Sequence, residues 1–225
     1  MPTYDDLQSK KSDLIRKALD GSCFAAGQNA TPIERLTGPT GELLALPTGT
    51  GVNAWGDVGY LTSDGMQQSR ESSQSEVTSF GRQTPTRTDI TADVTTVTIS
   101  AQETNLRTIG MATGFDMATV RPLQGGEVVL RKPARPSPRI YRILNLAVDL
   151  NDAGEIYIAR FYPRAKVTSF GEQPFGGGDD PILWPVTLTA EMDDDLGFSE
   201  AWHFGGPGWR AILDDMGFPA EETGA

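Results

Sequence analysis

The sequence predicts a mainly β protein with two or three peripheral helices, and two observations predict it. Thr and Val, which favour strands, are concentrated between Glu71 and Ser100, where thirteen of thirty residues are Ser or Thr. Further on, two strand-like segments flank Asn-Asp-Ala-Gly at 151–154, a turn sequence. A chain of 225 residues that is 38% hydrophobic is long enough for one domain with a substantial core.

The N-terminal segment has the pattern of an amphipathic helix from Tyr4 to Asp20, and Gly21 stands where such a helix would end. The stripe consists of Leu7, Leu14, Ile15, Ala18 and Leu19. Loops rich in Gly, Pro and Thr follow, with a short strand expected at 42–46. These features predict an N-terminal helical arm and loop over 1–50 and a β domain over 51–225.

Two long strands, 66–80 and 86–103, are predicted to form an antiparallel hairpin. Apolar residues occupy even positions in 90–94 and odd positions in 97–101, so an inserted residue, a β-bulge, is expected near Thr95–Thr96. The stretch 71–79 is polar on both faces, which a strand in an ordinary sandwich is not. The predicted solvent face of the second strand consists of Asp89, Thr91, Asp93, Thr96, Thr98 and Ser100.

The rest of the chain continues the β pattern between short helices. The expected elements are, in order, a helix from 106 to Gly114, strands at 127–131, 139–150, 155–170 and 182–192, and a helix from Pro207 that ends at Gly217.

Residues that could carry chemistry are few. His203 and Cys23 are the single histidine and the single cysteine, and neither is accompanied by a recognisable catalytic partner. The acidic loops lack the ligand order of a calcium loop. We therefore predict no catalytic residue, cofactor or metal, and an enzyme is the weaker hypothesis. A single cysteine fits a reducing compartment. Because the sequence shows no apolar signal-peptide core and no apolar stretch of membrane-spanning length, we expect neither export nor membrane insertion.

Charge is unevenly distributed along the chain. Residues 1–166 carry 18 acidic and 18 basic side chains, whereas 167–225 carry 12 acidic side chains and Arg210, so the second part holds the whole net charge of −11. This balance disfavours a strong nucleic-acid binder. It is compatible with a plain solvated surface or with self-complementary subunits. The candidates for such a contact are Arg131, Lys132 and Arg135 on one side and Asp179, Asp180, Asp193, Asp194 and Asp195 on the other.

Several short motifs occur in a characteristic order. They are Gly59-Tyr60-Leu61, Ser63-Asp64-Gly65, Phe80-Gly81, Glu103-Thr104-Asn105 and the closing segment Gly206–Phe218. This order resembles the major tail proteins, or tail tube subunits, of siphophages that infect actinobacteria, over roughly 52–218. The resemblance implies the phage tail tube fold: two packed antiparallel sheets, a barrel-like sandwich, with flanking short helices.

The resemblance also implies an assembly. Subunits would form homohexameric rings, the rings would stack in the virion tail, and paired hairpins would enclose a lumen for double-stranded DNA that is not specifically bound. The predicted solvent face would line that lumen, where acidic groups repel phosphates. Implied partners are the tape measure, tail terminator and distal tail proteins, with assembly in the host cytoplasm.

Two other readings remain open at this point. A monomeric β-sandwich could bind carbohydrate through exposed tryptophans, namely Trp55, Trp184, Trp202 and Trp209. A hydrolase could use an acidic pair that the sequence pattern does not single out.

Overall fold

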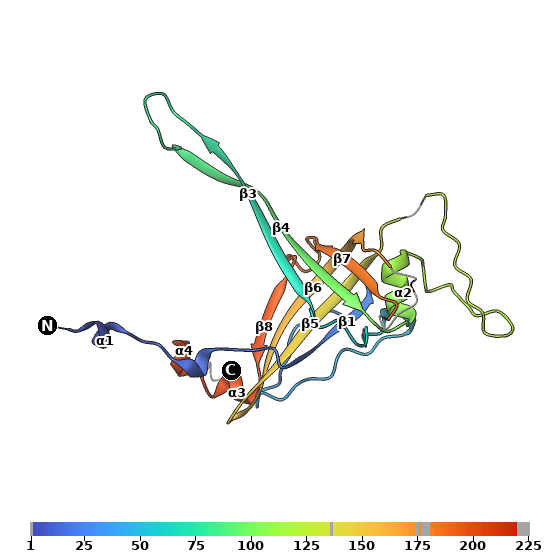
Figure 1. Cartoon of the computed structure of the whole chain (residues 1–225), viewed down its shortest axis with the longest axis horizontal. Helices are drawn as coiled ribbons and strands as arrows, with labels where there is room; N and C mark the ends of the chain where they lie inside the picture. The colour runs from blue at the N-terminus through green and yellow to red at the C-terminus, as the bar shows by residue number, and fades with distance from the viewer. Residues whose placement is uncertain (1, 136, 174–175, 177–180, 220–225) are drawn as a thin grey trace.

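The architecture is an eight-stranded antiparallel sheet with short helices at its periphery (Figure 1). The computed structural model describes residues 2–135, 137–173, 176 and 181–219. The strands are β1 (Asp20–Gly27), β2 (Gly56–Asp57), β3 (Gln67–Val77), β4 (Arg87–Ala101), β5 (Ile140–Asn151), β6 (Gly154–Phe170), β7 (Trp184–Ala190) and β8 (Ala201–Gly205). The helices are α1 (Tyr4–Leu7), α2 (Leu106–Thr113), α3 (Pro207–Arg210) and α4 (Leu213–Met216), with 3-10 turns η1 (Ser12–Leu14) and η2 (Gly51–Asn53).

The sheet curls so that its two halves pack against each other. Its strand order is β2-β1-β5-β6-β7-β4-β3. The eighth strand, β8, lies outside this linear order and pairs with β6. One core cluster joins Cys23 on β1, Ile143 on β5, Ile99 on β4 and Leu188 on β7, all fully or almost fully buried. Because β1 and β4 are not neighbours in the sheet, both can reach this cluster only if the sheet folds over it. The mainly β prediction is confirmed, and the two packed layers belong to one continuous sheet.

A second core cluster covers the other face of β5 and β6. Leu144, Tyr157 and Phe161 pack there against Ile33 and Leu36 from the long loop after β1. Since β5 and β6 are buried on both faces, their sequences are nearly continuous apolar runs rather than strict alternations. This central pair is therefore the most rigid part of the sheet, to which the outer strands are attached.

Several predicted elements are confirmed. Strands β5 and β6 flank the expected turn, and β7 occupies the centre of the expected strand. Helix α2 begins at the N-cap Asn105, whose side chain accepts hydrogen bonds from the backbone N–H groups of Arg107 and Thr108, and it ends at the left-handed Gly114. The C-terminal helix is present as two short helices, α3 and α4, followed by Gly217.

Other predictions were wrong. The helix expected from Tyr4 to Asp20 is reduced to the single turn α1 and the 3-10 turn η1, and Asp20–Gly27 is a strand, β1, paired along its whole length with β5. Residues 127–131 form no strand, although Leu123 and Glu127 close a turn there. The segment at 42–46 makes only an isolated bridge between Thr37 and Leu43.

The two isoleucines of β4 provide a matched test of this packing. Ile99 is 1% exposed in the first core cluster, whereas Ile90 is 68% exposed on the same strand. Ile99→Ala should lower the free energy of unfolding by about 2–5 kcal/mol because it leaves a cavity. Ile90→Ala should change it by no more than about 1 kcal/mol, the span of strand propensities. Urea unfolding measures both, and equal losses would contradict the assigned core.

Candidate assembly site on the projecting hairpin

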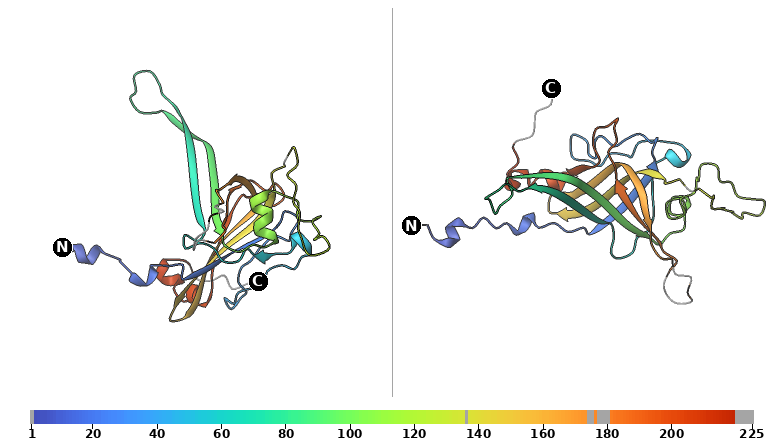
Figure 2. Two further views of the ribbon diagram at one scale, coloured as in Figure 1. Left: turned by 45° about the vertical axis from the view of Figure 1, so that its right-hand side comes forward. Right: turned by 90° about the horizontal axis from the view of Figure 1, so that it is seen from above.

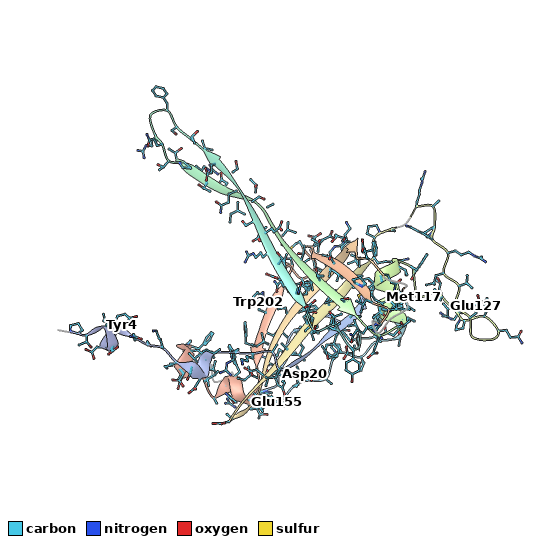
Figure 3. All side chains as sticks on the ribbon, viewed as in Figure 1. Tyr4, Asp20, Met117, Glu127, Glu155 and Trp202 are labelled. Carbon is cyan, nitrogen blue, oxygen red and sulfur yellow. The ribbon has the colours of Figure 1, made fainter. Side chains whose placement is uncertain are left out.

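The hairpin of β3 and β4 leaves the body of the protein as a long two-stranded arm (Figures 1 and 2). Residues 87–94 of β4 are all exposed, whereas the odd positions from Thr95 to Ala101 are buried. Thus β4 is anchored in the core by its second half and is in water on both faces in its first half. Phe80 is fully exposed in the connecting loop, and side chains project from both sides of the hairpin (Figure 3).

The bulge in β4 lies at Thr91 and not near Thr95–Thr96, where the sequence predicted it. Ser73 pairs with Ala92, and the next residue of β3, Gln74, pairs with Ile90, so Thr91 is the inserted residue. The apolar pattern was ambiguous because residues 90–94 are exposed and need no consistent face. Only the pairing with β3 fixes which residue is extra.

The position of the bulge decides the face of each residue beyond it. Paired residues share a face of the sheet, and Asp89 pairs with Ser75, which has the same parity on β3 as Ser69, the partner of Thr96. Asp89 therefore lies on the face of Thr96, Thr98 and Ser100. Asp93 has the parity of buried Thr95 and lies on the opposite face. The six residues predicted to share one face are thus divided between two faces and a bulge.

A threonine-rich surface, which we call the threonine face, extends from β4 across β7 to β6 on the side away from the first core cluster. Thr96 and Thr98 pair with Thr189 and Thr187 of β7. The hydroxyl oxygens of Thr98 and Thr187 are 3.1 Å apart, and those of Thr168 and Thr189 are 2.9 Å apart. These hydroxyls satisfy one another, and the same surface carries Lys166 of β6, which pairs with Thr189 and lies 3.3 Å from Glu191.

Asp93 and Asp89, the two acidic residues of the hairpin in the predicted solvent face, both form ion pairs. The guanidinium of Arg70 donates to Asp93 through Nε, at 2.7 Å from Oδ1, and through Nη2. These hydrogen bonds hold the pKa of the Asp93 carboxyl below its usual range. Arg87 Nε donates to Asp89 at 2.6 Å. The positive charges of Arg70 and Arg87 therefore offset the negative charges of Asp93 and Asp89 on the hairpin.

The described geometry agrees with the comparison with known families. A family model described as Phage tail tube protein matches residues 9–202, most of the chain. The chain belongs to the phage tail tube protein family. No curated protein matches the sequence. As a member of this family the chain is a structural protein of the phage tail.

The charged residues proposed for contacts between tail tube subunits have different surroundings. Arg131, Lys132 and Arg135 are exposed in the loop between α2 and β5, and Asp194 and Asp195 are exposed after β7. Asp193 is buried, lies 3.7 Å from Arg142 and accepts hydrogen bonds from the backbone of the following turn. Asp179 and Asp180, predicted to take part in the same contact, lie outside the described residues.

The two side chains that could be reactive, Cys23 and His203, are packed into the fold. Cys23 is fully buried, and burial raises the pKa of its thiol. His203 lies half-buried on β8, where desolvation lowers the pKa of its imidazole. Among the described residues no three His, Cys, Asp or Glu side chains are grouped to hold a metal ion, and no described helix could span a membrane.

The tryptophans do not form a common platform for sugar. Trp55 packs against Phe161, and Trp209 stacks on Phe204 with ring centroids 4.9 Å apart. The Trp184 indole donates to Thr104 at 3.0 Å. Trp202 is exposed, but the guanidinium carbon of Arg160 lies 4.2 Å from the centre of its ring. The Trp202 ring also lies 6.1 Å from that of Phe204, so Trp202, Phe204 and Trp209 form one aromatic cluster, and the contacts of Trp55 and Trp184 lie outside it.

The pairing across the hairpin can be tested by titration. Arg70→Gln should raise the pKa of Asp93 toward its usual range, because the variant loses the charged double hydrogen bond. Arg70→Lys retains the charge but not the planar fork, so its Asp93 should titrate between the two. NMR of the Asp93 carboxyl across pH, at concentrations that keep the protein unassembled, measures each value. An unchanged pKa in Arg70→Gln would show that the pair does not form in solution.

Proposed function

We propose that the chain forms homohexameric rings that stack into the tail tube of a siphophage infecting actinobacteria, and that double-stranded DNA leaves the virion through the lumen. The observation that supports this most directly is the hairpin that projects from the core and is wet on both faces. An isolated two-stranded hairpin is marginal in water, so such an arm is best explained by neighbours that complete it.

The edge of the sheet gives the hairpin a way to meet those neighbours. β3 is the last strand of the sheet, so one side of its backbone has no strand beside it in the described part of the subunit. Unpaired edges invite pairing with another chain, and closure of a ring removes them. Hairpins from six subunits would in this way continue the sheet into one barrel around the lumen.

The threonine face is proposed as the lumen wall. It contains Thr96, Thr98 and Ser100 of the predicted set, continues across β7 and β6, and reaches Asp89 on the hairpin. Asp93 points to the other face and Thr91 is the bulge residue, so neither belongs to this wall in our proposal. The hydroxyls of this wall are paired with one another, and its cations Lys166 and Arg87 are paired with Glu191 and Asp89, so few free cations would hold phosphates.

Charge complementarity is proposed to orient stacking. Arg131, Lys132 and Arg135 would meet Asp194 and Asp195 of the next ring, together with Asp179 and Asp180. Such exposed pairs contribute about 0–1 kcal/mol each, so they would guide direction more than affinity. The tube would bind the tape measure, tail terminator and distal tail proteins, catalyse no reaction, and assemble in the host cytoplasm.

Electron microscopy and mass photometry test the assembly. At micromolar concentration the purified protein should give species of six subunits, stacked rings or tubes, because each subunit carries an unpaired strand edge. If the protein needs help to nucleate, addition of the tape measure and distal tail proteins should supply it. A strict monomer in the presence of these partners would refute the proposal.

Two single variants test which face lines the lumen. Asp89→Lys should slow DNA ejection several-fold, since every subunit would add a cation that contacts phosphate. Asp93→Lys, the matched control on the opposite face of the same strand, should have a much smaller effect. Ejection is timed from virions of each variant after tube assembly is verified by microscopy. A larger effect of Asp93→Lys would assign the lumen to the other face.

A further inference from the structure

The N-terminal arm, residues 2–19, is fixed to the body along one half only. Lys11 Nζ lies 2.6 Å from Asp215 Oδ1, and Arg16 Nη1 lies 3.3 Å from the nearly buried carboxylate of Asp149. The backbone N–H of Leu19 donates to Val148 at 2.9 Å. Beyond Lys11 the chain continues away from the body, and Tyr4 lies at the far end of the molecule (Figure 3).

The outer half of the arm carries a pre-formed helical turn, α1. Thr3 and Asp6 form a capping box, in which Thr3 N–H donates to Asp6 Oδ2 at 2.7 Å and Asp6 N–H donates back to the Thr3 hydroxyl. Tyr4 and Leu7, three residues apart and so on the same side of the turn, are each 72% exposed. A single turn is unstable alone in water, and this capped turn presents two apolar side chains that no described residue of the same subunit covers.

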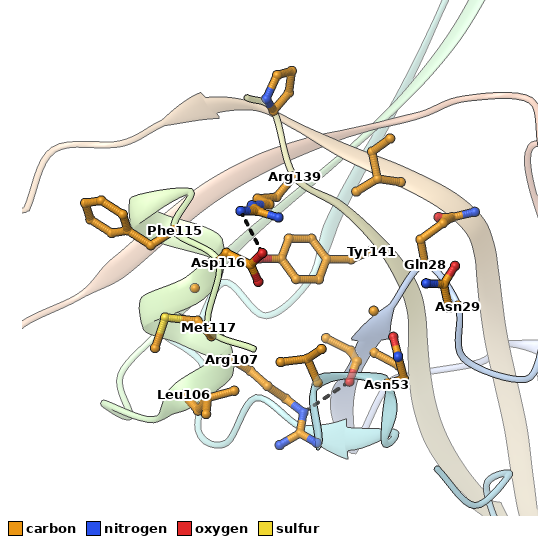
Figure 4. Close-up of a pocket in the computed structure, with 17 residues that line it drawn as sticks. Gln28, Asn29, Asn53, Leu106, Arg107, Phe115, Asp116, Met117, Arg139 and Tyr141 are labelled. Carbon is orange, nitrogen blue, oxygen red and sulfur yellow. Dashed lines mark hydrogen bonds and ion pairs between the residues drawn. The ribbon is translucent and has the colours of Figure 1, made fainter. Parts of the chain in front are cut away.

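A pocket of about 300 Å³ lies at the opposite end of the molecule, between α2 and the beginning of β5 (Figure 4). Its apolar lining includes Leu106, Phe115 and Met117. Two arginines also line it. Arg107 is held by the carbonyl oxygens of Ala25 and Ala54 at 3.1 and 2.9 Å, and Arg139 pairs with Asp116 at 3.3 Å.

Charge in the two regions is complementary. The α1 turn contains Asp5 and Asp6 within its first turn. The charged side chains that line the pocket are Arg107, Arg139 and Asp116, so the lining has a net positive charge. The acidic turn and its two apolar side chains therefore match a pocket that has an apolar lining and two arginines.

We propose that the α1 turn of one subunit docks into this pocket of the next subunit. Tyr4 and Leu7 would enter among the apolar side chains, and Asp5 would face the arginines. Helix α2, which borders the pocket, and the N-terminal arm lie at opposite ends of the molecule in Figures 1 and 2, so a subunit's own arm points away from its own pocket. Unlike surfaces at opposite ends join identical chains head to tail. The inference rests on the proposed function for the presence of a neighbouring subunit.

Engineered cysteines test the contact in the full chain. Leu7→Cys combined with Leu106→Cys should form intersubunit disulfides under a mild oxidant such as diamide, because docking would bring the two residues together. Native Cys23 is fully buried and does not compete. The control replaces Leu106→Cys by Leu43→Cys, since Leu43 and Leu106 are 44% and 46% exposed. The test pair should give about tenfold more disulfide-linked multimer than the control, the population ratio of ~1.4 kcal/mol.

A charge variant and a second readout keep the outcomes distinct. Adding Asp5→Lys to the test pair should lower the yield, whereas a merely accidental collision would be insensitive to it. The same samples are viewed by electron microscopy. Tubes without specific cross-links overturn the docking and leave the proposed function standing. Specific cross-links without rings or tubes support the docking and count against the proposed function, and absence of both overturns both.

Discussion

The position of the projecting hairpin depends on one strand, β4, that is half in the core and half in water. Val97, Ile99 and Ala101 insert on one face into the first core cluster, and the same stretch forms the ladder with β7. The outer half of β4 buries nothing and is held by its backbone pairing with β3 and by side-chain pairs such as Arg70–Asp93. A hairpin that is anchored at one end in this way has a defined direction, but its outer part has little stability of its own. It is therefore suited to become ordered when a neighbouring chain packs beside it.

The bulge at Thr91 has consequences along the whole hairpin. A shift of one residue exchanges the faces of every side chain beyond it. With the inserted residue at 91, Asp89 joins the threonine face and Asp93 leaves it. Because both carboxylates are paired with arginines of the same hairpin, the wall of the proposed lumen would owe its low affinity for DNA mainly to neutral hydroxyls. Repulsion between carboxylates and phosphates, which the sequence alone suggested, would be a smaller contribution.

The sequence predicted those elements whose pattern reflects burial in the subunit itself. The sequence was sufficient to predict β5, β6, β7 and the capped helix α2, because their apolar residues pack into a core of the same chain. β1 was missed because Asp-Gly-Ser-Cys-Phe-Ala-Ala-Gly consists mostly of small residues with weak strand propensity. It is a strand because β5 pairs with it. A Cβ atom at Gly21 would lie 2.8 Å from the Leu146 carbonyl oxygen, so the close approach suits glycine. The position of the bulge and the continuation of the threonine face onto β7 and β6 could not be predicted, since both depend on which strands are neighbours.

The failed helix at the N-terminus has a different cause, and it connects the fold to assembly. The apolar stripe in 4–19 is real, but Leu7, Ile15 and Leu19 remain exposed, because the subunit offers no surface that covers them. The segment 127–131 behaves alike: its Val128 and Val129 are half-exposed and no strand lies beside them. Apolar periodicity records where burial is needed and does not specify which chain supplies it. If the protein works as a polymer, as we propose, sequence patterns that the described subunit leaves unsatisfied would indicate surfaces that meet the next subunit. The N-terminal arm and the loop after α2 are the two candidates, and they lie at opposite ends of this molecule.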